Sequence, residues 1–348
     1  MRKRKYLYIV VVGVFVFLYY VFGVDDYIHA RSYDKEFDYP LNIDIRPLVD
    51  EVLAGKKPSV APINFYPYRF LSNSGKCTLI EKIDLFIIVK SAMNNFERRE
   101  AIRQTYGMET FNQGIVMSTM FFVGVDEPKS ATQRRLEHEM ADYKDIIQVD
   151  FQDTYHNNTI KTMMAFRWLY EHCPIADYYF FTDDDMYVSI ENLLEYVKEQ
   201  TDTKQIDPSS GTQINGRDSL FYAGYMFHSS PQRFKSSKWR ISLEEYPFDR
   251  WPPYITAGAY VLSNRAMKVM YAASLFVKNF RFDDIYLGIV AKKANIPLTH
   301  CPRIYFYKKS SSIDGYKDVI ASHGFNDPEV LMMTWKHLHI QNPNSKVG

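Results

Sequence analysis

Three adjacent aspartates near the middle of the chain are its strongest candidates for chemistry. Asp183, Asp184 and Asp185 follow the apolar run 178–181, which has the composition of a buried strand. Neighbouring carboxylates repel one another unless a cation lies among them. Hard divalent ions such as Mg²⁺ and Mn²⁺ take oxygen ligands and bridge carboxylates to phosphates. The run therefore predicts a metal site for a phosphate-bearing substrate, and the alternative is an acidic, solvated strand end.

A second acidic pair, Asp283 and Asp284, precedes the apolar run 285–291. If that run forms a helix, Asp284 lies in the positive field of the helix N-terminus, which keeps a carboxylate ionised at neutral pH. An ionised carboxylate in this place can act as a general base. Simple capping of the helix is the alternative.

Two basic side chains, Arg99 and Arg103, are spaced one helical turn apart and share a helix face. Paired guanidinium groups near a helix start suit a phosphate or a nucleotide. Glu97 and Glu100 are close in sequence, so a surface face of salt bridges is equally open.

His323 follows a polar stretch and precedes a helix start at Asp327 and Pro328. A lone histidine is more often structural than a metal ligand, and His300 and His228 compete for the same role. The aromatic residues Trp239, Trp251 and Tyr254 are candidates for sugar stacking, with a core or rim position as the alternative.

Alternating strands and helices are expected to position these groups. Asn94 and Glu97 resemble a capping box, and Ser189 is an expected helix cap. The runs 83–89, 120–125, 146–151 and 260–262 read as strands, and 98–106, 161–172, 190–197 and 266–278 read as helices. This order predicts a mainly parallel α/β sheet, in which ligands bind at the carboxyl ends of the strands.

The chain start reads as a membrane anchor. Residues 1–5 are basic, and the nineteen positions 6–24 carry no charge and reach roughly 28 Å as a helix. Bulky residues lead directly into Asp25 and Asp26 without a small-residue cleavage site, so we expect an uncleaved signal-anchor. The basic flank predicts a cytosolic tail (1–5), a transmembrane helix (6–24) and a luminal remainder. A buried core helix is the alternative, but the run has no polar face.

Beyond the anchor, residues 25–75 contain five prolines and no sustained period, which predicts a luminal stem, and 76–348 a catalytic domain. Cys77, Cys173 and Cys301 allow one intrachain pair and leave one cysteine over. Asn157 begins the only N-x-S/T sequon and is a candidate glycan acceptor. A net charge of +1 over 348 residues argues against nucleic acid as the main partner.

Six motifs, in this order and spacing, resemble the β-1,3-galactosyltransferase/β-1,3-N-acetylglucosaminyltransferase family. The resemblance covers about residues 80 to 337. The motifs are Phe96 to Gly107, Asp150 to Tyr155, Lys161-Thr162, Thr182 to Asp185, Trp251 to Tyr254 with Tyr260 to Ser263, and Asp283 to Gly288.

The resemblance implies a GT-A (Rossmann-like) α/β fold in a type II Golgi membrane protein. It implies a UDP-sugar donor bound through Mn²⁺, a glycan acceptor on protein or lipid, and inversion at the anomeric carbon. Carried over, the metal ligands are Asp183, Asp185 and His323, with Asp185 the best direct ligand. The catalytic motif is Asp283-Asp284, with Asp284 preferred as the base. The remaining positions expected at the nucleotide-sugar are Arg99, Arg103, Lys161, Asp183 and Asp184.

Two departures from the family pattern leave the sugar open. Tyr106 stands where the family commonly has Trp, and the stretch 255–259 differs where the sugar site is expected. Galactose transfer is favoured, and N-acetylglucosamine or N-acetylgalactosamine transfer is the alternative. A catalytically inactive, glycan-binding or escort member is a second alternative. A phosphoryl or nucleotidyl transferase is a third, but the chain lacks a glycine-rich phosphate loop. Oligomeric state is left open.

Overall fold

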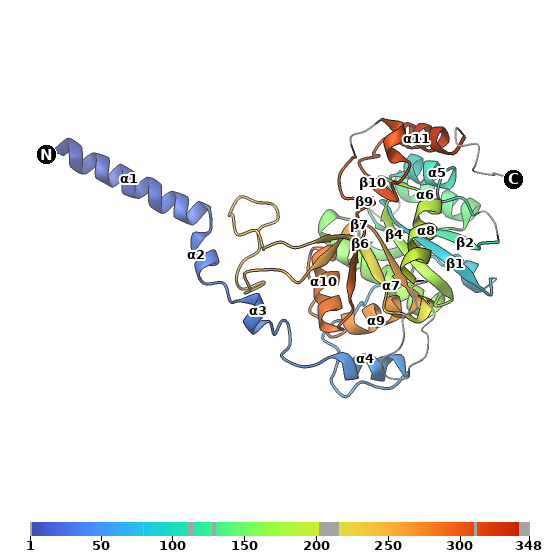
Figure 1. Ribbon diagram of the computed structural model, residues 1–348, viewed down its shortest axis with the longest axis horizontal. Coiled ribbons are helices and arrows are strands. Elements are labelled where there is room, and N and C mark those ends of the chain that lie inside the picture. Colours follow the sequence, from blue (N-terminus) through green and yellow to red (C-terminus); the bar gives the residue numbers. More distant parts are fainter. Residues whose placement is uncertain are drawn as a thin grey trace. The chain divides into compact units, whose positions relative to one another are not determined.

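The computed structural model describes residues 2–78, 80–109, 114–126, 130–201, 216–309 and 312–340. The chain divides into two compact units (Figure 1). One unit combines Met1–Ile43 with Phe227–Pro253, and the other combines Asp44–Met226 with Tyr254–Gly348. The second unit contains every residue that we expected to bind the metal or the nucleotide or to act as the base.

A seven-stranded sheet forms the centre of the larger unit, in the order β3-β2-β1-β4-β7-β6-β8. Strand β1 pairs in parallel with β2 and β4, β2 with β3, and β6 with β8, whereas β4 and β7 are antiparallel. The predicted α/β class with a mainly parallel sheet is therefore confirmed. The strands are β1 (Ile83–Lys90), β2 (Met117–Val125), β3 (Ile146–Gln152), β4 (Ala176–Asp183), β6 (Tyr222–Phe227), β7 (Tyr254–Ser263) and β8 (Leu298–His300).

Helices cover both faces of this sheet, which explains why β1 is apolar along nearly its whole length. Phe86 packs on Trp168 of α7 on one face, while Ile87 joins a core with Ile102 of α5 and Leu193 of α8 on the other. The helices of the unit, apart from α4, are α5 (Phe96–Arg103), α6 (Ala131–Tyr143), α7 (Asn158–His172), α8 (Ile190–Thr201), α9 (Asn264–Ser274), α10 (Asp283–Lys293) and α11 (Pro328–Ile340).

The helix starts follow the sequence signals unevenly. The Ser189 hydroxyl accepts a hydrogen bond from the Asn192 amide, as predicted, and Ser263 caps α9 in the same way. The predicted capping box at Asn94 is wrong. The cap position of α5 is Asn95, which makes no side-chain capping bond, and its side-chain NH2 group donates to Asp184.

A small second sheet was not predicted from the sequence. Its strands are β5 (Met186–Val188), β10 (Ala321–His323) and β9 (Ile304–Tyr305), in the order β5-β10-β9. Strands of two or three residues carry too little pattern to be recognised. This sheet matters because β5 begins directly after the acidic run and β10 ends at His323.

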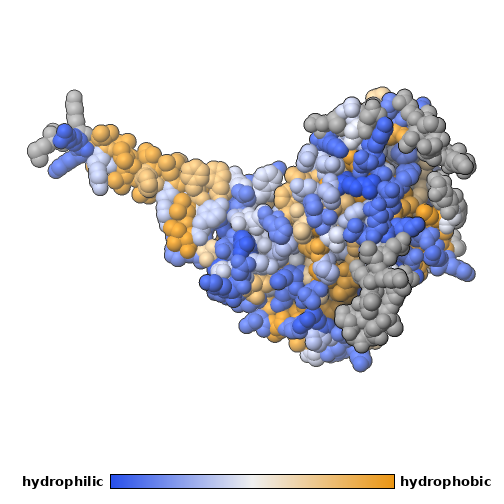
Figure 2. All heavy atoms as spheres, viewed as in Figure 1, coloured by the Kyte–Doolittle hydropathy of each residue, from blue (hydrophilic) through white to orange (hydrophobic). Residues whose placement is uncertain are grey.

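The N-terminal helix α1 (Arg2–Val21) is long and apolar enough to cross a membrane. Its window Arg4–Val21 has a mean hydropathy of 1.6 and no part of it is buried. Figure 2 shows the helix as a mainly apolar rod with a hydrophilic free end. Length and composition alone carry this assignment, which agrees with the predicted anchor. Two short helices follow, α2 (Val24–Ile28) and α3 (Tyr33–Glu36).

The predicted stem, residues 25–75, is not a spacer over its whole length in the structure. From Asp44 onward the chain belongs to the larger unit, where α4 (Arg46–Leu53) buries Leu48 and Val49 and packs on α9. Prolines interrupt any period in this segment, so its buried apolar residues could not be recognised from spacing. Only residues 25–43 of the predicted spacer lie outside the catalytic unit.

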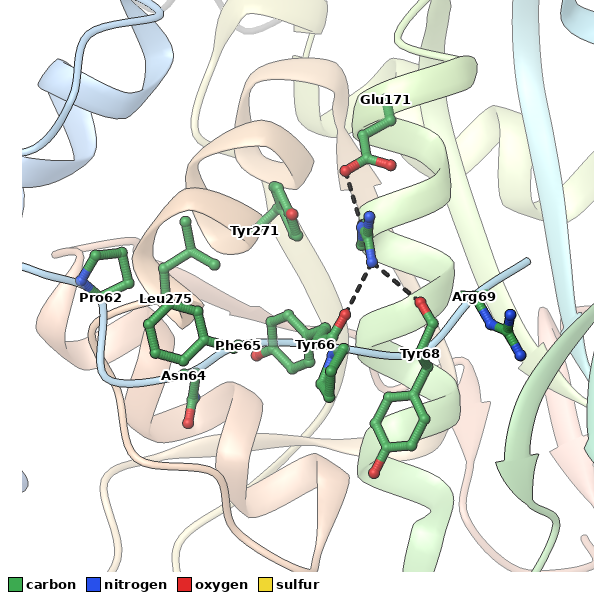
Figure 3. A pocket seen from close by; sticks show the side chains of 11 residues that line it. Pro62, Asn64, Phe65, Tyr66, Tyr68, Arg69, Glu171, Tyr271 and Leu275 are labelled. Carbon is green, nitrogen blue, oxygen red and sulfur yellow. Dashed lines mark hydrogen bonds and ion pairs between the residues drawn. The ribbon is translucent and has the colours of Figure 1, made fainter.

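Residues 62–69 line a hollow of about 470 Å³ against α7 and α9 (Figure 3). Arg167 of α7 donates to the carbonyl oxygens of Tyr66 (2.8 Å) and Tyr68 (3.2 Å) and pairs with Glu171 (2.8 Å). The Tyr66 hydroxyl lies 3.0 Å from that of Tyr286 in α10. These contacts tie the segment to α7 and α10. Cys77, just beyond it, forms a disulfide with Cys173 at the end of α7, and Cys301 is a buried free thiol.

Candidate active site

The two acidic motifs meet at the carboxyl end of β1, through a residue that sequence reasoning missed. Lys90 is the register partner of Asp183 across β1 and β4. Its ammonium nitrogen lies 3.0 Å from Asp183 Oδ1 and 2.9 Å from Asp283 Oδ2, and it donates to the Ala257 carbonyl at 3.1 Å. One buried cation therefore joins carboxylates that are a hundred positions apart in sequence.

Charge compensation keeps this network ionised. Burial alone would lower the pKa of Lys90, but Asp183 and Asp283 raise it. Burial raises the pKa of Asp183 to about 6, with the Asp185 and Asp283 charges adding to the rise and Lys90 opposing it. Burial would also raise the pKa of Asp283, yet Lys90 and the Thr162 hydroxyl bond, at 2.8 Å, lower it.

The pair at the start of α10 separates into two different environments. Asp283 is 7% exposed, and its Oδ2 accepts from both Lys90 and Thr162. Asp284 is half-buried, and its Oδ1 accepts from the Ile285 amide at 2.8 Å. Burial and the neighbouring Asp283 raise the pKa of Asp284 to about 7. A carboxyl group near neutral pKa suits a general base, whereas Asp283 is committed to the internal network.

The small second sheet brings His323 to the acidic run. His323 is the register partner of Met186, and its Nε2 lies 3.2 Å from Asp185 Oδ2. The amides of Gly324 and Phe325 donate to the Asp185 carbonyl at 3.1 and 2.8 Å. The Asp185 bond raises the pKa of His323. Burial alone would raise the pKa of Asp185, but His323 and the charge of Arg98 lower it.

Asp184, the middle carboxylate, points into the loop after β1. It accepts from the Ser91 hydroxyl (2.7 Å), the Asn95 amide (2.8 Å) and Arg98 (2.9 Å). Arg98 also donates to the backbone carbonyl and side-chain oxygen of Asn326, just before α11. Asp184 therefore holds α5 and the segment before α11 around the acidic run.

The sequence model of the galactosyltransferase family ("Galactosyltransferase") matches residues 97–302, more than half of the chain. This chain belongs to the galactosyltransferase family. It is similar to "Beta-1,3-galactosyltransferase brn" of Drosophila melanogaster, at 38% identity over 92% of each chain. It is also 31% identical to human "Lactosylceramide 1,3-N-acetyl-beta-D-glucosaminyltransferase", over 89% of this chain and 79% of that protein. The predicted family is confirmed, and the protein is a glycosyltransferase that uses a sugar donor and a glycan acceptor.

Among solved structures, the chain is similar to a glycosyltransferase involved in the glycosylation of the major capsid of PBCV-1. The identity is 12%, the TM-score is 0.37, and the match covers 72% of this chain and 99% of that one. This likeness is too distant to add to the assignment.

Three cations that we expected at the nucleotide in this glycosyltransferase are engaged inside the protein. Arg99 is fully buried, and its guanidinium donates to both oxygens of Glu139 and to three groups of the 91–93 loop, which uses all five of its N–H donors. Arg103 pairs with Asp145 (2.8 Å) and Glu139 (2.8 Å). Both arginines therefore form salt bridges that stabilise the fold. This matches the salt-bridge alternative, except that the salt bridges are buried and do not lie on the surface.

The third of these cations, Lys161, is buried 2.8 Å from Asp153 and donates to the Ser91 carbonyl. It stabilises the same loop that holds Asp184. The structure therefore groups Asp183, Asp185, His323, Asp283 and Asp284 near the end of β4 and uses Arg99, Arg103, Lys161 and Asp184 as their support.

The residues missed by sequence reasoning are Lys90, Ser91 and Arg98. A signal for Lys90 existed, because a lysine that ends a buried parallel strand needs a carboxylate partner. Arg98 was obscured by the more regular spacing of its two arginine neighbours.

A divalent cation fits this site in one respect. Asp185 Oδ1 is buried and accepts no hydrogen bond from the residues that the structure describes, which is costly for a carboxylate oxygen unless a ligand supplies the partner. Among the described residues, no three His, Cys, Asp or Glu side chains already form a metal-binding cluster. Mg²⁺-like ions need only one or two carboxylates when phosphates and water complete the shell.

Proposed function

We propose that this glycosyltransferase moves a hexose, galactose in the first instance, from a UDP-sugar to a glycan acceptor in β-1,3 linkage. The names of the relatives support the linkage and the sugar. One observation carries the proposal beyond the family. Lys90 holds the acidic run and the Asp283-Asp284 motif together at one end of the sheet, and this supports a donor site next to a base.

The reaction is a single displacement with inversion. The acceptor hydroxyl oxygen attacks the anomeric carbon while its proton passes to the free carboxylate oxygen of Asp284. The bond between the anomeric carbon and the β-phosphate oxygen breaks, and the electron pair leaves with UDP. An α-linked donor thus gives a β-linked product. Asp283 and Lys90 hold the start of α10 in place.

The proposed cofactor is Mn²⁺, held by Asp185 and Asp183 with His323. When bound, this ion neutralises the charge that develops on the diphosphate. The unsatisfied Asp185 Oδ1 supports this placement. His323 would keep Asp185 in position through their 3.2 Å contact even if it does not itself bind the ion.

The sugar itself has a specific alternative. One relative is named as an N-acetylglucosaminyltransferase, so transfer of that sugar, or of N-acetylgalactosamine, is the second candidate. Half-exposed Ala257 and Gly258 of β7 lie at the carboxylates, and a Cβ at Gly258 would lie 3.9 Å from Asp183 Oδ2. Small residues here leave room for the donor sugar. An inactive, glycan-binding member is the remaining alternative.

The proposed location is the Golgi membrane, with α1 as a type II anchor and the catalytic unit in the lumen. The apolar helix supports the anchor. The basic residues before it support the orientation.

A donor screen tests the proposal. Full-length protein in detergent is supplied with Mn²⁺, a glycan acceptor, and UDP-galactose, UDP-N-acetylglucosamine or UDP-N-acetylgalactosamine, and UDP release is measured. We expect one donor to be used, and excess EDTA or Asp185→Asn to abolish transfer. Asp218→Asn, at an exposed position, is the matched control. Full activity in EDTA would refute the metal, and no release with any donor would favour the inactive alternative.

A further inference from the structure

The segment Phe227–Pro253 leaves the sheet at the end of β6 and returns at the start of β7, and it packs against the start of the chain. The Lys235 amide donates to the carbonyl of Val21, the last residue of α1, at 2.9 Å. The Phe22 ring stacks on Phe234 at 5.3 Å. Asp26 pairs with Lys235 at 3.9 Å and with Arg240 at 3.8 Å. The segment is therefore built onto the end of the apolar helix.

Internal bonds give this segment a fixed shape. The guanidinium of Arg233 is buried and donates to the carbonyls of Ile241, Tyr246 and Phe248, each at 2.9 Å. A guanidinium that satisfies three carbonyls in a buried site closes the loop 233–248 upon itself.

Residues 31–33 make a second set of hydrogen bonds to the same segment. The Arg31 amide donates to Pro247 O (2.8 Å), and the Asp249 amide donates to Arg31 O (2.9 Å). Tyr33 donates its amide to the Asp249 carboxylate at 2.8 Å. Residues 21–33 therefore form part of a packed unit. Cleavage at the end of the apolar helix would remove Val21 and Phe22, the partners of Lys235 and Phe234.

The exposed side chains of the segment have the chemistry of a membrane interface. Trp239 is 49% exposed, and the Lys238 ammonium lies 4.4 Å from its ring centre. The Lys235 ammonium lies 5.1 Å from the ring centre of Tyr20, on the last turn of α1. Trp and Tyr rings beside Lys at the end of an apolar helix are typical of the headgroup region, where rings meet the lipid and ammonium groups stay in water.

We propose that the segment Phe227–Pro253 is a membrane-surface contact, with Trp239 and Lys238 in the lipid headgroup layer beside the luminal end of α1. This rests on the proposed membrane anchoring. Trp239 then serves the membrane rather than sugar stacking, the role considered from the sequence.

Tryptophan quenching tests this contact. The full-length protein is placed in phosphatidylcholine nanodiscs whose acyl chains carry bromine close to the headgroup, a short-range quencher. The chain has four Trp, and Trp168 and Trp251 are buried. We expect bromine-dependent quenching in the wild type, its loss in Trp239→Phe, and weaker quenching in Lys238→Glu. Trp335→Phe, in α11, is the matched control and keeps the quenching.

Two results would overturn the contact: no quenching of the wild type, or equal quenching of the wild type and Trp239→Phe. UDP release in detergent with a water-soluble acceptor reports the transferase function separately. A protein that is quenched but inactive therefore retains the membrane contact and loses only the proposed function. A protein that is active but not quenched shows the reverse.

Discussion

At the end of β1, the ammonium group of Lys90 lies within 3.0 Å of two carboxylates that belong to different motifs. Its side chain is 5% exposed. Removing this charge leaves Asp183 and Asp283 buried without their cation, a loss that typically costs about 3–5 kcal/mol. We expect Lys90→Met to lower the free energy of unfolding by that order, measured by urea denaturation, and to abolish transfer.

A double variant separates charge from packing in this network. Lys90→Met with Asp283→Asn removes one cation and one anion together, so it should recover part of the stability lost in Lys90→Met alone. Lys82→Met is the matched control, because the Lys82 side chain is 61% exposed in its pairing with Asp84 and should change little. A double variant as unstable as the sum of the two single variants would argue against the ion-pair account.

The acidic pair of α10 predicts a division of effects between two amide substitutions. Asp284→Asn should cut turnover by about a hundredfold or more, the size associated with a lost general base, and leave stability almost unchanged. Asp283→Asn should cost less turnover but lower stability by on the order of 3 kcal/mol, because Asp283 is paired in the interior. Turnover, donor affinity and thermal unfolding of both variants are measured together. If Asp283→Asn is the less active protein and Asp284→Asn retains turnover, the roles must be exchanged.

The pH profile reports the same base. The pKa of Asp284 is raised to about 7, and only its deprotonated form can accept the acceptor proton. The competent fraction therefore rises with pH through about 7, and kcat/KM should fall about tenfold per pH unit well below it. Asp284→Asn should remove this limb from whatever activity remains. If the acidic side of the kcat/KM profile is unchanged in that variant, a group other than Asp284 titrates there.

At the scale of elements, the sequence predicted the strands and helix starts that have a regular local pattern. The apolar run of β1, the strand of the acidic run and the cap of α8 at Ser189 all follow local rules. What could not be predicted depends on tertiary pairing. β5 and β10 contain three residues each, and only their antiparallel register places His323 beside Asp185. The membership of Lys90 in the site likewise follows from its register with Asp183.

The boundary of the catalytic unit gives an element-scale prediction. A fragment that starts at residue 76, the predicted domain start, lacks Ile45, Leu48, Val49 and Tyr66, all buried. Each fully buried apolar side chain contributes about 1.5–3 kcal/mol, and domains are stable by only 5–15 kcal/mol. We expect this fragment to yield little folded protein, whereas a matched fragment from Asp44 should fold. The yield of monomer and the midpoint of thermal unfolding are compared. Equal stability would show that the segment 44–75 is dispensable.

At the scale of the whole molecule, three features point to the same compartment. The disulfide between Cys77 and Cys173 is typical of oxidising compartments. The apolar helix with its basic flank predicts a single anchor whose following chain is luminal. The sequon at Asn157 lies at the start of α7, on the unit that carries the disulfide. Anchor, disulfide and sequon therefore each favour the same proposed topology, in which the catalytic unit is luminal.

Glycosylation of Asn157 tests that topology, and the structure indicates that the glycan is added before the region folds. The Asn157 side-chain amide donates to the Gln152 carbonyl at 2.8 Å, and Thr159 of the same sequon is 1% exposed. The Asn157 amide is thus engaged and Thr159 is buried in the folded protein, so we expect the glycan to be added while the chain enters the lumen, before this region folds. We expect one endoglycosidase-sensitive glycan on protein made in a glycosylating host, and its loss in Asn157→Gln. Because a sequon can be skipped, protease protection in sealed microsomes decides the orientation. Digestion of the catalytic unit from the cytosolic side would reverse the topology, and with it the membrane face to which Trp239 is assigned.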